Sequence, residues 1–295
     1  MAPRPFLAHN VMSHDATSRD VTSHDAAGRD DTWRGDPAAV RRAIRSGTHL
    51  GPTAGLAPGR LQGNLVILPR EWAADFLRYC VANPKPCPLL GVGEVGAPHL
   101  PNLGADLDIR TDLPRYRVHR DGRHADTVTE LTGLWSDDLV AHVIGCSFGF
   151  EDAVMRAGVP VRHVTAGRNV PMYETAIDTH PAGPFGGPLV VSMRAMPPAD
   201  AIRAIAIADR MPLAHGAPVH FGDPGAIGIR DLHAPEFGDA PIIEPGDVPV
   251  FWACGVTPQL ALRRAAPPLA ITHEPGHMLV TDGVAEAPMP LSPAH

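Results

Sequence analysis

Residues 215–229 read HGAPVHFGDPGAIGI and place four glycines, two prolines, two histidines and one aspartate between short apolar pairs. So many glycines and prolines exclude a packed helix and predict loop backbone that enters and leaves short strands. His215, His220 and Asp223 supply groups that titrate or bind ligands, and glycine lets a ligand approach the backbone. The alternative is a crossover whose histidines only cap strand ends. Five other stretches of the same character favour the functional interpretation.

The composition is that of a soluble globular enzyme. The chain has 295 residues, enough for one large α/β domain or two smaller ones, with 44% hydrophobic and 19% charged residues. The net charge of −7 argues against nucleic acid as a partner, because nothing in the chain builds a cationic phosphate-binding face. Lys85 is the only lysine, so a Schiff-base mechanism would have to run through that one residue.

The chain has four cysteines that form no Cys-x-x-Cys pair: Cys80, Cys87, Cys146 and Cys254. Together with the absence of a signal peptide, this predicts reduced thiols in a cytoplasmic protein, without a zinc knuckle or a disulfide framework. The longest apolar run, residues 139–150, is interrupted by polar side chains and is too short to span a bilayer. We therefore expect no membrane association.

The chain is expected to divide into two tails and one catalytic unit. Residues 1–34 repeat a polar ten-residue unit and have almost no apolar side chains to bury, which predicts a disordered tail. Residues 35–283 are expected to form a single α/β catalytic unit, and residues 284–295 a C-terminal tail. Residues 105–190 are hairpin-like and rich in turns, which makes them a candidate for a smaller inserted α+β subdomain.

Helical and strand patterns alternate along the catalytic unit. Helices are expected at residues 37–46, 69–81, 136–144, 150–157, 199–208 and 258–265. Strands are expected at residues 65–68, 89–92, 107–110, 116–119, 189–193, 249–253, 269–272 and 278–280. This alternation predicts an α/β fold in three layers, a mainly parallel sheet with helices on both faces.

Arginines and amides gather in three stretches and could bind a carboxylate. Residues 108–117 carry three arginines and two aspartates, and on a strand Arg115 and Arg117 share a face. A surface ladder of ion pairs explains this stretch equally well. Further donors come from residues 168–173 and from Arg194.

Two turns carry candidate nucleophiles. Ser147 would cap the helix expected after it, and the free N–H groups there could hold an anion or a developing oxyanion. Cys146 beside it is either an activated thiol or an inert buried one. Cys254 stands at the carboxyl end of an expected strand, where ligands bind in open α/β sheets, and Thr257 would cap the next helix.

A metal or a cofactor is not expected. His215, His220, Asp223 and His273 are conceivable metal ligands, but none of their spacings is a helical ligand pair. The chain has no Gly-x-Gly-x-x-Gly after its first strand, no P-loop and no Gly-x-Ser-x-Gly elbow, so the dinucleotide, nucleotide and α/β-hydrolase readings lack their signatures.

Seven stretches together resemble the D-glutamate cyclase family, in order and over residues 36–282. They are NPKPCP (83–88), the block 108–117, GCSF (145–148), RNVPMY (168–173), VSMR (191–194), HGAPVH (215–220) and FWACGVTPQ (251–259). The resemblance implies conversion of D-glutamate to 5-oxo-D-proline with loss of water. It also implies an α/β fold with a larger three-layer part and a smaller part. Bacterial members of the family are labelled hydro-lyases.

This chemistry needs a cationic clamp on a carboxylate, a general base, donors for an oxyanion and an acid for the leaving oxygen. Arg110 and Arg115 are the expected clamp, His215 or His220 the acid/base, and Ser147 or Asn169 the oxyanion donor. The candidate catalytic residues are His215, His220, Asp223, Cys254, Cys146 and Ser147. The candidate substrate-binding residues are Arg110, Arg115, Asn169, Tyr173, Arg194 and Thr257.

Two alternatives remain beside the cyclase. Cys146 and Cys254 each sit in a turn rich in Gly, Ser or Thr, as thiols do in amino-acid racemases that work without a cofactor. A non-catalytic protein that binds a small dicarboxylate would use the arginines and glycine loops without chemistry. In each case the partner is a small carboxylate or amino acid, and a homo-oligomer is the common state for such a chain.

Overall fold

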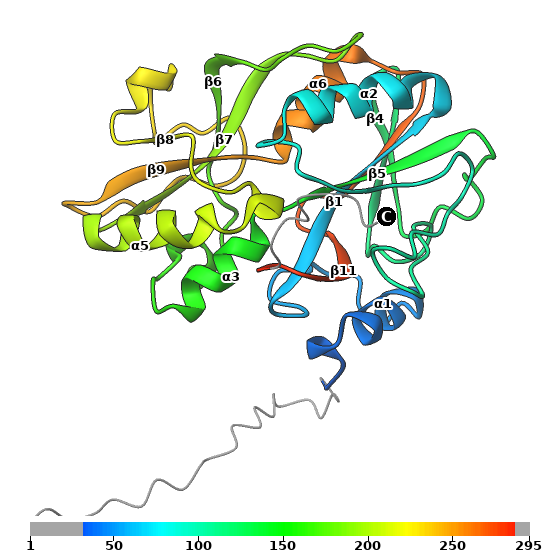
Figure 1. Cartoon of the computed structure of the whole chain (residues 1–295), viewed down its shortest axis with the longest axis horizontal. Helices are drawn as coiled ribbons and strands as arrows, with labels where there is room; N and C mark the ends of the chain where they lie inside the picture. The colour runs from blue at the N-terminus through cyan, green and yellow to red at the C-terminus, as the bar shows by residue number, and fades with distance from the viewer. Residues whose placement is uncertain (1–31, 287–295) are drawn as a thin grey trace, which may run out of the picture. The chain divides into compact units, whose positions relative to one another are not determined.

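Strand β1 (Arg60–Pro69) is the centre of the larger of two sheets, because eight consecutive residues along it are buried. The computed structural model describes residues 32–286. Here β1 pairs with β5 (Leu139–Gly145) on one side, and with β10 (Ala270–His273) and β11 (Leu279–Val284) on the other. The strand order is β2–β5–β1–β10–β3–β4. Figure 1 labels β1, β4, β5 and β11 of this sheet. The three outer strands are β2 (Leu89–Val92), β3 (Tyr116–Arg120) and β4 (Arg123–Val128).

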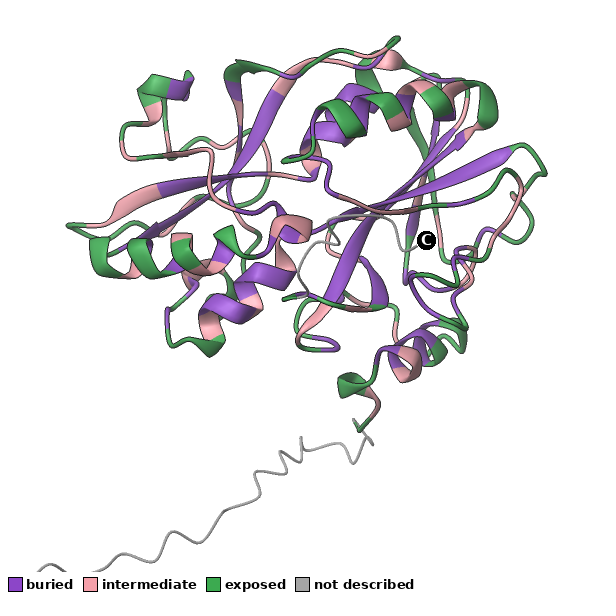
Figure 2. Ribbon diagram, viewed as in Figure 1, coloured by how far each residue is buried: buried purple, intermediate pink, exposed green. Residues whose placement is uncertain are grey.

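The smaller sheet has the strand order β6–β7–β9–β8. Its strands are β6 (Met172–Asp178), β7 (Pro188–Met196), β9 (Val248–Ala253) and β8 (His220–Phe221). Helices α3 (Phe148–Arg156) and α5 (Pro198–Asp209) cover one face of this sheet, with Phe150 and Trp252 in the core between them. A separate apolar cluster that includes Tyr173 and Phe251 lies on the other face. In Figure 2 both sheets are buried along their central strands, whereas the outer side of α5 is exposed.

Four further helices and three short 3₁₀ turns complete the described residues. The helices are α1 (Pro37–Arg45), α2 (Arg70–Ala82), α4 (Arg162–Thr165) and α6 (Val256–Ala265). The 3₁₀ turns are η1 (Thr32–Gly35), η2 (Pro212–Ala214) and η3 (Pro224–Ile227). Helix α1 begins as its sequence predicts: the Asp36 carboxylate accepts the N–H of Ala39 at 2.9 Å, and Pro37 follows directly.

The predicted mixture of helices and strands is confirmed, but the prediction of a mainly parallel sheet is wrong. Within residues 32–286 every paired strand is antiparallel to its neighbour. Strands β1 and β2, which α2 connects, do run in the same direction, but β5 lies between them and pairs with both. A strand buried on both faces shows the same apolar run in either arrangement, so hydrophobic periodicity does not reveal the inserted strand.

Two expected elements are wrong in type. Residues 136–144, expected as a helix, are a turn followed by β5, and the Ser136 hydroxyl donates to Asp138 at 2.6 Å instead of capping a helix. Both faces of β5 are covered, and a run rich in β-branched residues fits such a strand. Residues 107–110, expected as a strand, form a loop that is tied down by the Tyr116 hydroxyl, which donates to the carbonyl of Ile109 at 2.7 Å.

The residues expected as an inserted subdomain, 105–190, are divided between the two sheets: β3, β4 and β5 belong to the larger one, and β6 and the start of β7 to the smaller. The predicted N-terminal tail lies outside the described residues except for Thr32–Arg34, which belong to η1. Of the predicted C-terminal tail only 284–286 are described. No helix between residues 32 and 286 is long and apolar enough to cross a membrane.

Candidate active site

Arg194 lies at the centre of the candidate site, on the face of the smaller sheet that α3 covers. Ser192 and Arg194 share this face, because Ser192 pairs directly with Trp252, whose ring stacks on Phe150 of α3 at 5.1 Å. The guanidinium carbon of Arg194 is 4.9 Å from the ring centre of Phe150 and 5.3 Å from that of Trp252. The two rings therefore hold a buried cation by cation–π interactions.

Every nitrogen of the Arg194 guanidinium has a partner. Nε donates to Glu151 Oε1 at 3.0 Å, and Nη2 donates to the same oxygen. Nη1 donates to Ser192 Oγ at 2.7 Å, and Nη2 also donates to Ser147 Oγ at 3.3 Å. The guanidinium thus bridges the hydroxyls of two serines that are far apart in the sequence.

Glu151 is ionised although it is buried. Burial raises the pKa of its carboxyl group, but the charge of Arg194 and the contact with His163, whose Nε2 lies 3.3 Å from Oε1, outweigh that effect and bring the pKa down to about 2. A buried carboxylate is stable only when it is paired and hydrogen-bonded. The pair therefore fixes the position of Arg194 against α3.

Cys146 and Cys254 occupy equivalent positions in the two sheets. Cys146 lies between β5 and α3, and Cys254 lies between β9 and α6. Burial raises the pKa of Cys146 to about 12 and also raises the pKa of Cys254, while the backbone N–H groups of Phe148 and Val256 act in the opposite direction. Those N–H groups belong to the first turns of α3 and α6, where helix termini favour negative charge.

The two serines connect both thiols to Arg194. The Ser147 hydroxyl lowers the pKa of the Cys146 thiol, and the Ser192 hydroxyl lowers that of the Cys254 thiol, whose Sγ also lies 3.5 Å from Met172 Sδ. Because the same hydroxyls accept from Nη2 and Nη1, the thiols are linked to the two ends of one guanidinium. The thiols are also close enough for their charges to interact with each other.

Two glycines allow the cysteine turns to approach their neighbours. A Cβ on Gly145 would lie 1.7 Å from the carbonyl oxygen of Leu213, and a Cβ on Gly255 would lie 2.5 Å from Asn64 Nδ2. Asn64 also donates to the carbonyl of Gly145 at 2.9 Å. The Asn64 side chain on β1 therefore contacts both turns, and neither glycine tolerates a larger residue without movement of the backbone or of Asn64.

His215 is buried beside this cluster and is neutral. Its backbone is left-handed (φ 75°), and its Nδ1 lies 2.8 Å from the carbonyl oxygen of Lys85, so Nδ1 carries the proton and donates it. Burial lowers the pKa of His215 to about 4, and the charges of Arg194, Lys85 and Glu151 also act on it. Nε2 has no hydrogen-bond partner among residues 32–286, which leaves a neutral proton acceptor next to Arg194.

His220 and Tyr173 lie on the opposite face of the smaller sheet. His220 pairs directly with Phe251, and their rings are 5.7 Å apart. Tyr173 contacts the same Phe251 ring at 6.5 Å. Because Phe251 and Trp252 are adjacent in β9, their side chains point to opposite faces. The sheet therefore separates His220 and Tyr173 from Arg194, although the sequence places His220 only five residues after His215.

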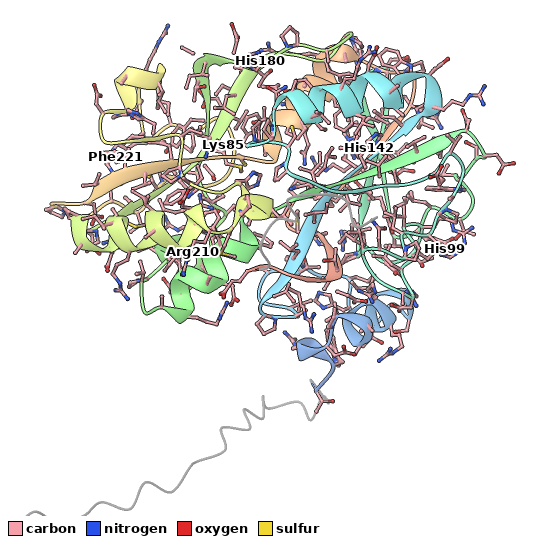
Figure 3. All side chains as sticks on the ribbon, in the orientation of Figure 1. Lys85, His99, His142, His180, Arg210 and Phe221 are labelled. Carbon is pink, nitrogen blue, oxygen red and sulfur yellow. The ribbon has the colours of Figure 1, made fainter. Side chains whose placement is uncertain are left out.

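Local contacts explain what His220 and Asp223 do instead. His220 Nε2 hydrogen-bonds the carbonyl of Asp223 at 2.7 Å, and the Asp223 carboxylate accepts the N–H of Gly225 at 2.9 Å to cap η3. Phe221, which follows His220, is labelled at the outer part of the smaller sheet in Figure 3, whereas Lys85 is labelled near the middle of the molecule.

The predicted clamp of Arg110 and Arg115 is not formed. Arg110 makes a bidentate ion pair with Asp108, with N···O distances of 3.0 and 2.7 Å. Arg115 is exposed at the start of β3, where its Nε donates to the carbonyl of Leu50 at 3.3 Å. Neither arginine contacts a residue of the Arg194 cluster, so the alternative of local ion pairing describes this stretch.

Thr257 and Asn169 are also engaged elsewhere. The Thr257 hydroxyl accepts the N–H of Val190 at 3.0 Å and donates to the carbonyl of the same residue at 3.1 Å, which joins α6 to β7. Asn169 is exposed, and its backbone N–H donates to Asp239 at 2.7 Å. Cys146, Ser147, Arg194, His215 and Cys254 are thus the candidates that the fold brings together.

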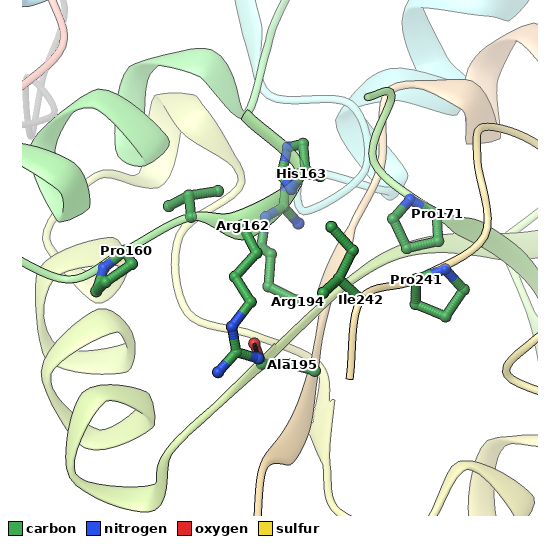
Figure 4. Close-up of a pocket in the computed structure, with 9 residues that line it drawn as sticks. Pro160, Arg162, His163, Pro171, Arg194, Ala195, Pro241 and Ile242 are labelled. Atoms are coloured by element: carbon green, nitrogen blue, oxygen red, sulfur yellow. Dashed lines mark hydrogen bonds between the residues drawn. The ribbon is translucent and has the colours of Figure 1, made fainter. Parts of the chain in front are cut away.

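A small cavity opens beside Arg194 and His163 (Figure 4). Its lining also includes prolines and aliphatic residues: Pro160, Val161, Pro171, Pro241 and Ile242. Its volume of about 20 Å³ has room for one water molecule. A cavity of this volume is too small to hold a dicarboxylate.

Sequence reasoning missed Glu151, His163, Ser192 and Lys85 as members of the site. Glu151 follows Ser147 by four residues on a helix, a spacing that puts both near the helix N-terminus, and Ser192 precedes Arg194 by two residues on a strand, which puts both on one face. These two signals are present in the sequence. Nothing local indicates His163 or Lys85. Within residues 32–286 no three His, Cys, Asp or Glu side chains converge as metal ligands do, so the conceivable metal set is dispersed.

Comparison with known proteins finds one matching family and relatives that share one name. The D-glutamate cyclase family matches residues 140–282, which include Arg194, His215 and both cysteine turns. A protein of Bordetella pertussis named "Putative hydro-lyase" is 63% identical over 243 residues, covering 82% of this chain and 88% of that protein. Proteins with the same name from Methylobacterium radiotolerans and a Jannaschia species are 60% and 57% identical over 247 and 256 residues. They cover 84% and 87% of this chain, and 91% and 96% of their own lengths.

Among solved structures, a nitrogen repressor-like protein from Methanococcus jannaschii aligns with 11% identity and a TM-score of 0.35. The alignment covers 78% of this chain and 90% of that protein, a likeness too low to inform either fold or function.

Proposed function

The chain belongs to the D-glutamate cyclase family, and we propose that it is a hydro-lyase that converts D-glutamate, or a related small dicarboxylate, to 5-oxo-D-proline and water. One observation supports the proposal: Cys146, Ser147, Arg194, His215 and Cys254, which come from four separate stretches of the sequence, gather around one buried ion pair. Buried titratable groups with shifted pKa values mark functional sites.

The reaction moves two protons, forms one C–N bond and breaks one C–O bond. The α-ammonium loses a proton, its nitrogen attacks the γ-carboxyl carbon, and the nitrogen then loses a second proton. Both protons end on the carboxyl oxygen that leaves as water, so the site needs an acid for this oxygen as well as a proton acceptor. His215 Nε2 is the proposed proton acceptor, because it is neutral and unpaired. The first-turn N–H groups of α3 and the Ser147 hydroxyl are the proposed donors to the oxyanion.

Arg194 supports this chemistry by its charge. Its N–H groups are already shared among Glu151, Ser192 and Ser147, so it does not clamp a carboxylate by itself. Its positive charge, held between two aromatic rings, favours the negative charge that develops on the tetrahedral intermediate. The second arginine that lines the cavity, Arg162, is paired with Asp247 and Glu244 and does not form the clamp expected of Arg110 and Arg115.

A direct experiment is to incubate the purified protein with D-glutamate and with L-glutamate, with and without EDTA, and to measure 5-oxoproline by mass spectrometry. Product from the D-isomer alone, unaffected by EDTA, is the expected result. A shift in melting temperature with glutamate, but without turnover, would instead identify a dicarboxylate-binding protein.

His215 and His220 form a matched pair for testing the mechanism. His215→Ala removes the proposed proton acceptor and is expected to slow turnover about 10²- to 10⁴-fold. His220→Ala removes a histidine on the other face of the sheet and should leave turnover near that of the wild type. Full activity in His215→Ala, with its folding verified by circular dichroism, would refute the assigned role.

A further inference from the structure

The proposed cyclisation does not explain the arrangement of the two thiols. The mechanism proposed above uses His215 as the proton acceptor and gives no role to Cys146 or Cys254. Yet the two thiols lie in equivalent strand–cysteine–helix turns, and Arg194 donates to the hydroxyls of Ser147, which follows Cys146, and of Ser192, which acts on the pKa of Cys254. A pair of equivalent acidic groups beside one cation is suited to a reaction with two equivalent proton transfers.

We propose that this site also exchanges the α-proton of its amino-acid substrate, with Cys146 and Cys254 acting on the two faces of the α-carbon. In each direction the thiolate of one cysteine takes the α-hydrogen as a proton, and the electron pair stays on the substrate, delocalised into the α-carboxylate. The thiol of the other cysteine then gives its proton to the opposite face of the same carbon. No group is oxidised or reduced, and the two cysteines exchange their protonation states.

The surroundings of the thiols fit these steps. The backbone N–H groups of Phe148 and Val256 favour each thiolate, and the charge of Arg194 favours the thiolate of Cys254. A cation near the carboxylate also stabilises the negative charge that the deprotonated substrate spreads onto its oxygens. Burial and the negative charge of Glu151 oppose the thiolate at both positions, but the substrate's own α-ammonium brings a positive charge that acts against them.

A second observation points to a ligand at the same place. His215 is 2% exposed, and its Nε2 has no hydrogen-bond partner within residues 32–286. It is near enough to Arg194 and Glu151 to feel their charges. An acceptor without a partner, on a buried side chain near the Arg194–Glu151 pair, is what an amino-acid substrate, which brings both an ammonium group and carboxylates, would complete.

The inference rests on the proposed function only for the choice of glutamate as the probe. The experiment incubates the wild-type protein in D₂O with D-glutamate and, separately, with L-glutamate. NMR follows the α-hydrogen signal of the remaining glutamate, and mass spectrometry measures deuterium in glutamate and in any 5-oxoproline. Ring closure and α-exchange are thereby read separately in one sample.

The expected result is deuterium at the α-carbon of both enantiomers. Cys146→Ser should slow exchange of one enantiomer about 10²-fold or more, and Cys254→Ser that of the other. Cys80→Ser is the control, because Cys80 is a buried cysteine that lies in the separate core cluster around Phe76 and should leave both exchange rates unchanged. A merely structural role would slow both enantiomers together and would lower the melting temperature.

Three results would overturn the inference. In the first, 5-oxoproline forms and retains its α-hydrogen while the glutamate stays unlabelled. In the second, both cysteine variants exchange the α-hydrogen as fast as the wild type, and in the third the wild type exchanges neither enantiomer. The first leaves the proposed cyclisation standing, whereas exchange without any 5-oxoproline supports the inference and contradicts cyclisation. If a serine variant does not fold, the wild type alone still distinguishes one base from two. A single base on one side of the α-carbon removes the hydrogen of one enantiomer only, so exchange of both enantiomers requires a base on each side.

Discussion

Glu151 and Arg194 form an ion pair whose side chains are only 4% and 3% exposed, and the pair joins the first turn of α3 to the middle of β7. Through this pair the helix that follows Cys146 and the sheet that precedes Cys254 are held together. Loss of either partner leaves a charge buried in the core, and loss of Arg194 also removes the donor to the hydroxyls of Ser147 and Ser192.

Glu151→Gln is expected to lower the free energy of unfolding by about 3–5 kcal/mol, because it leaves the buried guanidinium without its counter-charge. Urea unfolding followed by circular dichroism measures the change. The control is Glu286→Gln, which removes the exposed partner of Arg156 and should change the free energy by less than about 1 kcal/mol. A similar decrease in the free energy of unfolding in the two variants would show that the buried Glu151–Arg194 pair stabilises the fold no more than the exposed pair does.

Gly145→Ala is expected to destabilise the protein by about 1–3 kcal/mol or more, because its Cβ would meet the backbone oxygen of Leu213 at 1.7 Å. The strain falls directly before Cys146, so α-exchange should decline together with the melting temperature. The control is Gly133→Ala, because a Cβ at Gly133 would meet no atom within 4 Å. Gly158 is unsuitable as a control because its φ is positive. An unchanged melting temperature in Gly145→Ala would contradict the close contact between β5 and η2.

Acid should destabilise the fold between about pH 6.5 and pH 4. Burial lowers the pKa of His142, His215 and His273 to about 4, below the ordinary value of 6.5. In this window the unfolded chain binds protons that the folded chain excludes, so stability is fully present above pH 6.5 and falls as the pH falls. Each histidine contributes a loss on the order of 3 kcal/mol by pH 4. Urea midpoints measured from pH 8 to pH 4 test this, and a flat profile would contradict it.

His142→Leu isolates one of these histidines. His142 is fully buried beside the Phe76 ring, and neither of its ring nitrogens has a hydrogen-bond partner within the described residues. A leucine removes two unsatisfied polar atoms and the group that charges in acid, so stability at pH 7 should be retained or rise and the loss on acidification should be smaller. The same acid loss in His142→Leu as in the wild type would show that His142 is not one of the groups responsible.

Thr257→Val should lower the free energy of unfolding by about 1–3 kcal/mol, because the buried N–H and carbonyl of Val190 both lose their partner on α6. Differential scanning calorimetry measures the loss. Since the role of Thr257 is to join α6 to β7, the KM for glutamate should remain near that of the wild type. A large increase in KM with normal stability would instead support the predicted role of Thr257 in substrate binding.

The sequence by itself determined the local features whose cause lies within a few residues. Asp36 and Pro37 predict the start of α1, and alternating helix and strand patterns predict the mixed class. The turns at Cys146 and Cys254 are recognisable because glycine, a small polar residue and an expected helix follow one another closely. The family resemblance, carried by seven short stretches, also needs no structure and agrees with the relatives found by comparison.

The tertiary structure alone decided which strands are neighbours and which residues share a face. Insertion of β5 between β1 and β2 makes the sheet antiparallel, and this pairing depends on contacts across the whole chain. His215 and His220 look equivalent in sequence, yet one left-handed residue and one strand pairing put them on different faces of the smaller sheet. Hydrophobic periodicity reports only that a side chain is buried. Which buried group it meets, as Arg194 meets Glu151 and two serines, follows from packing between distant segments.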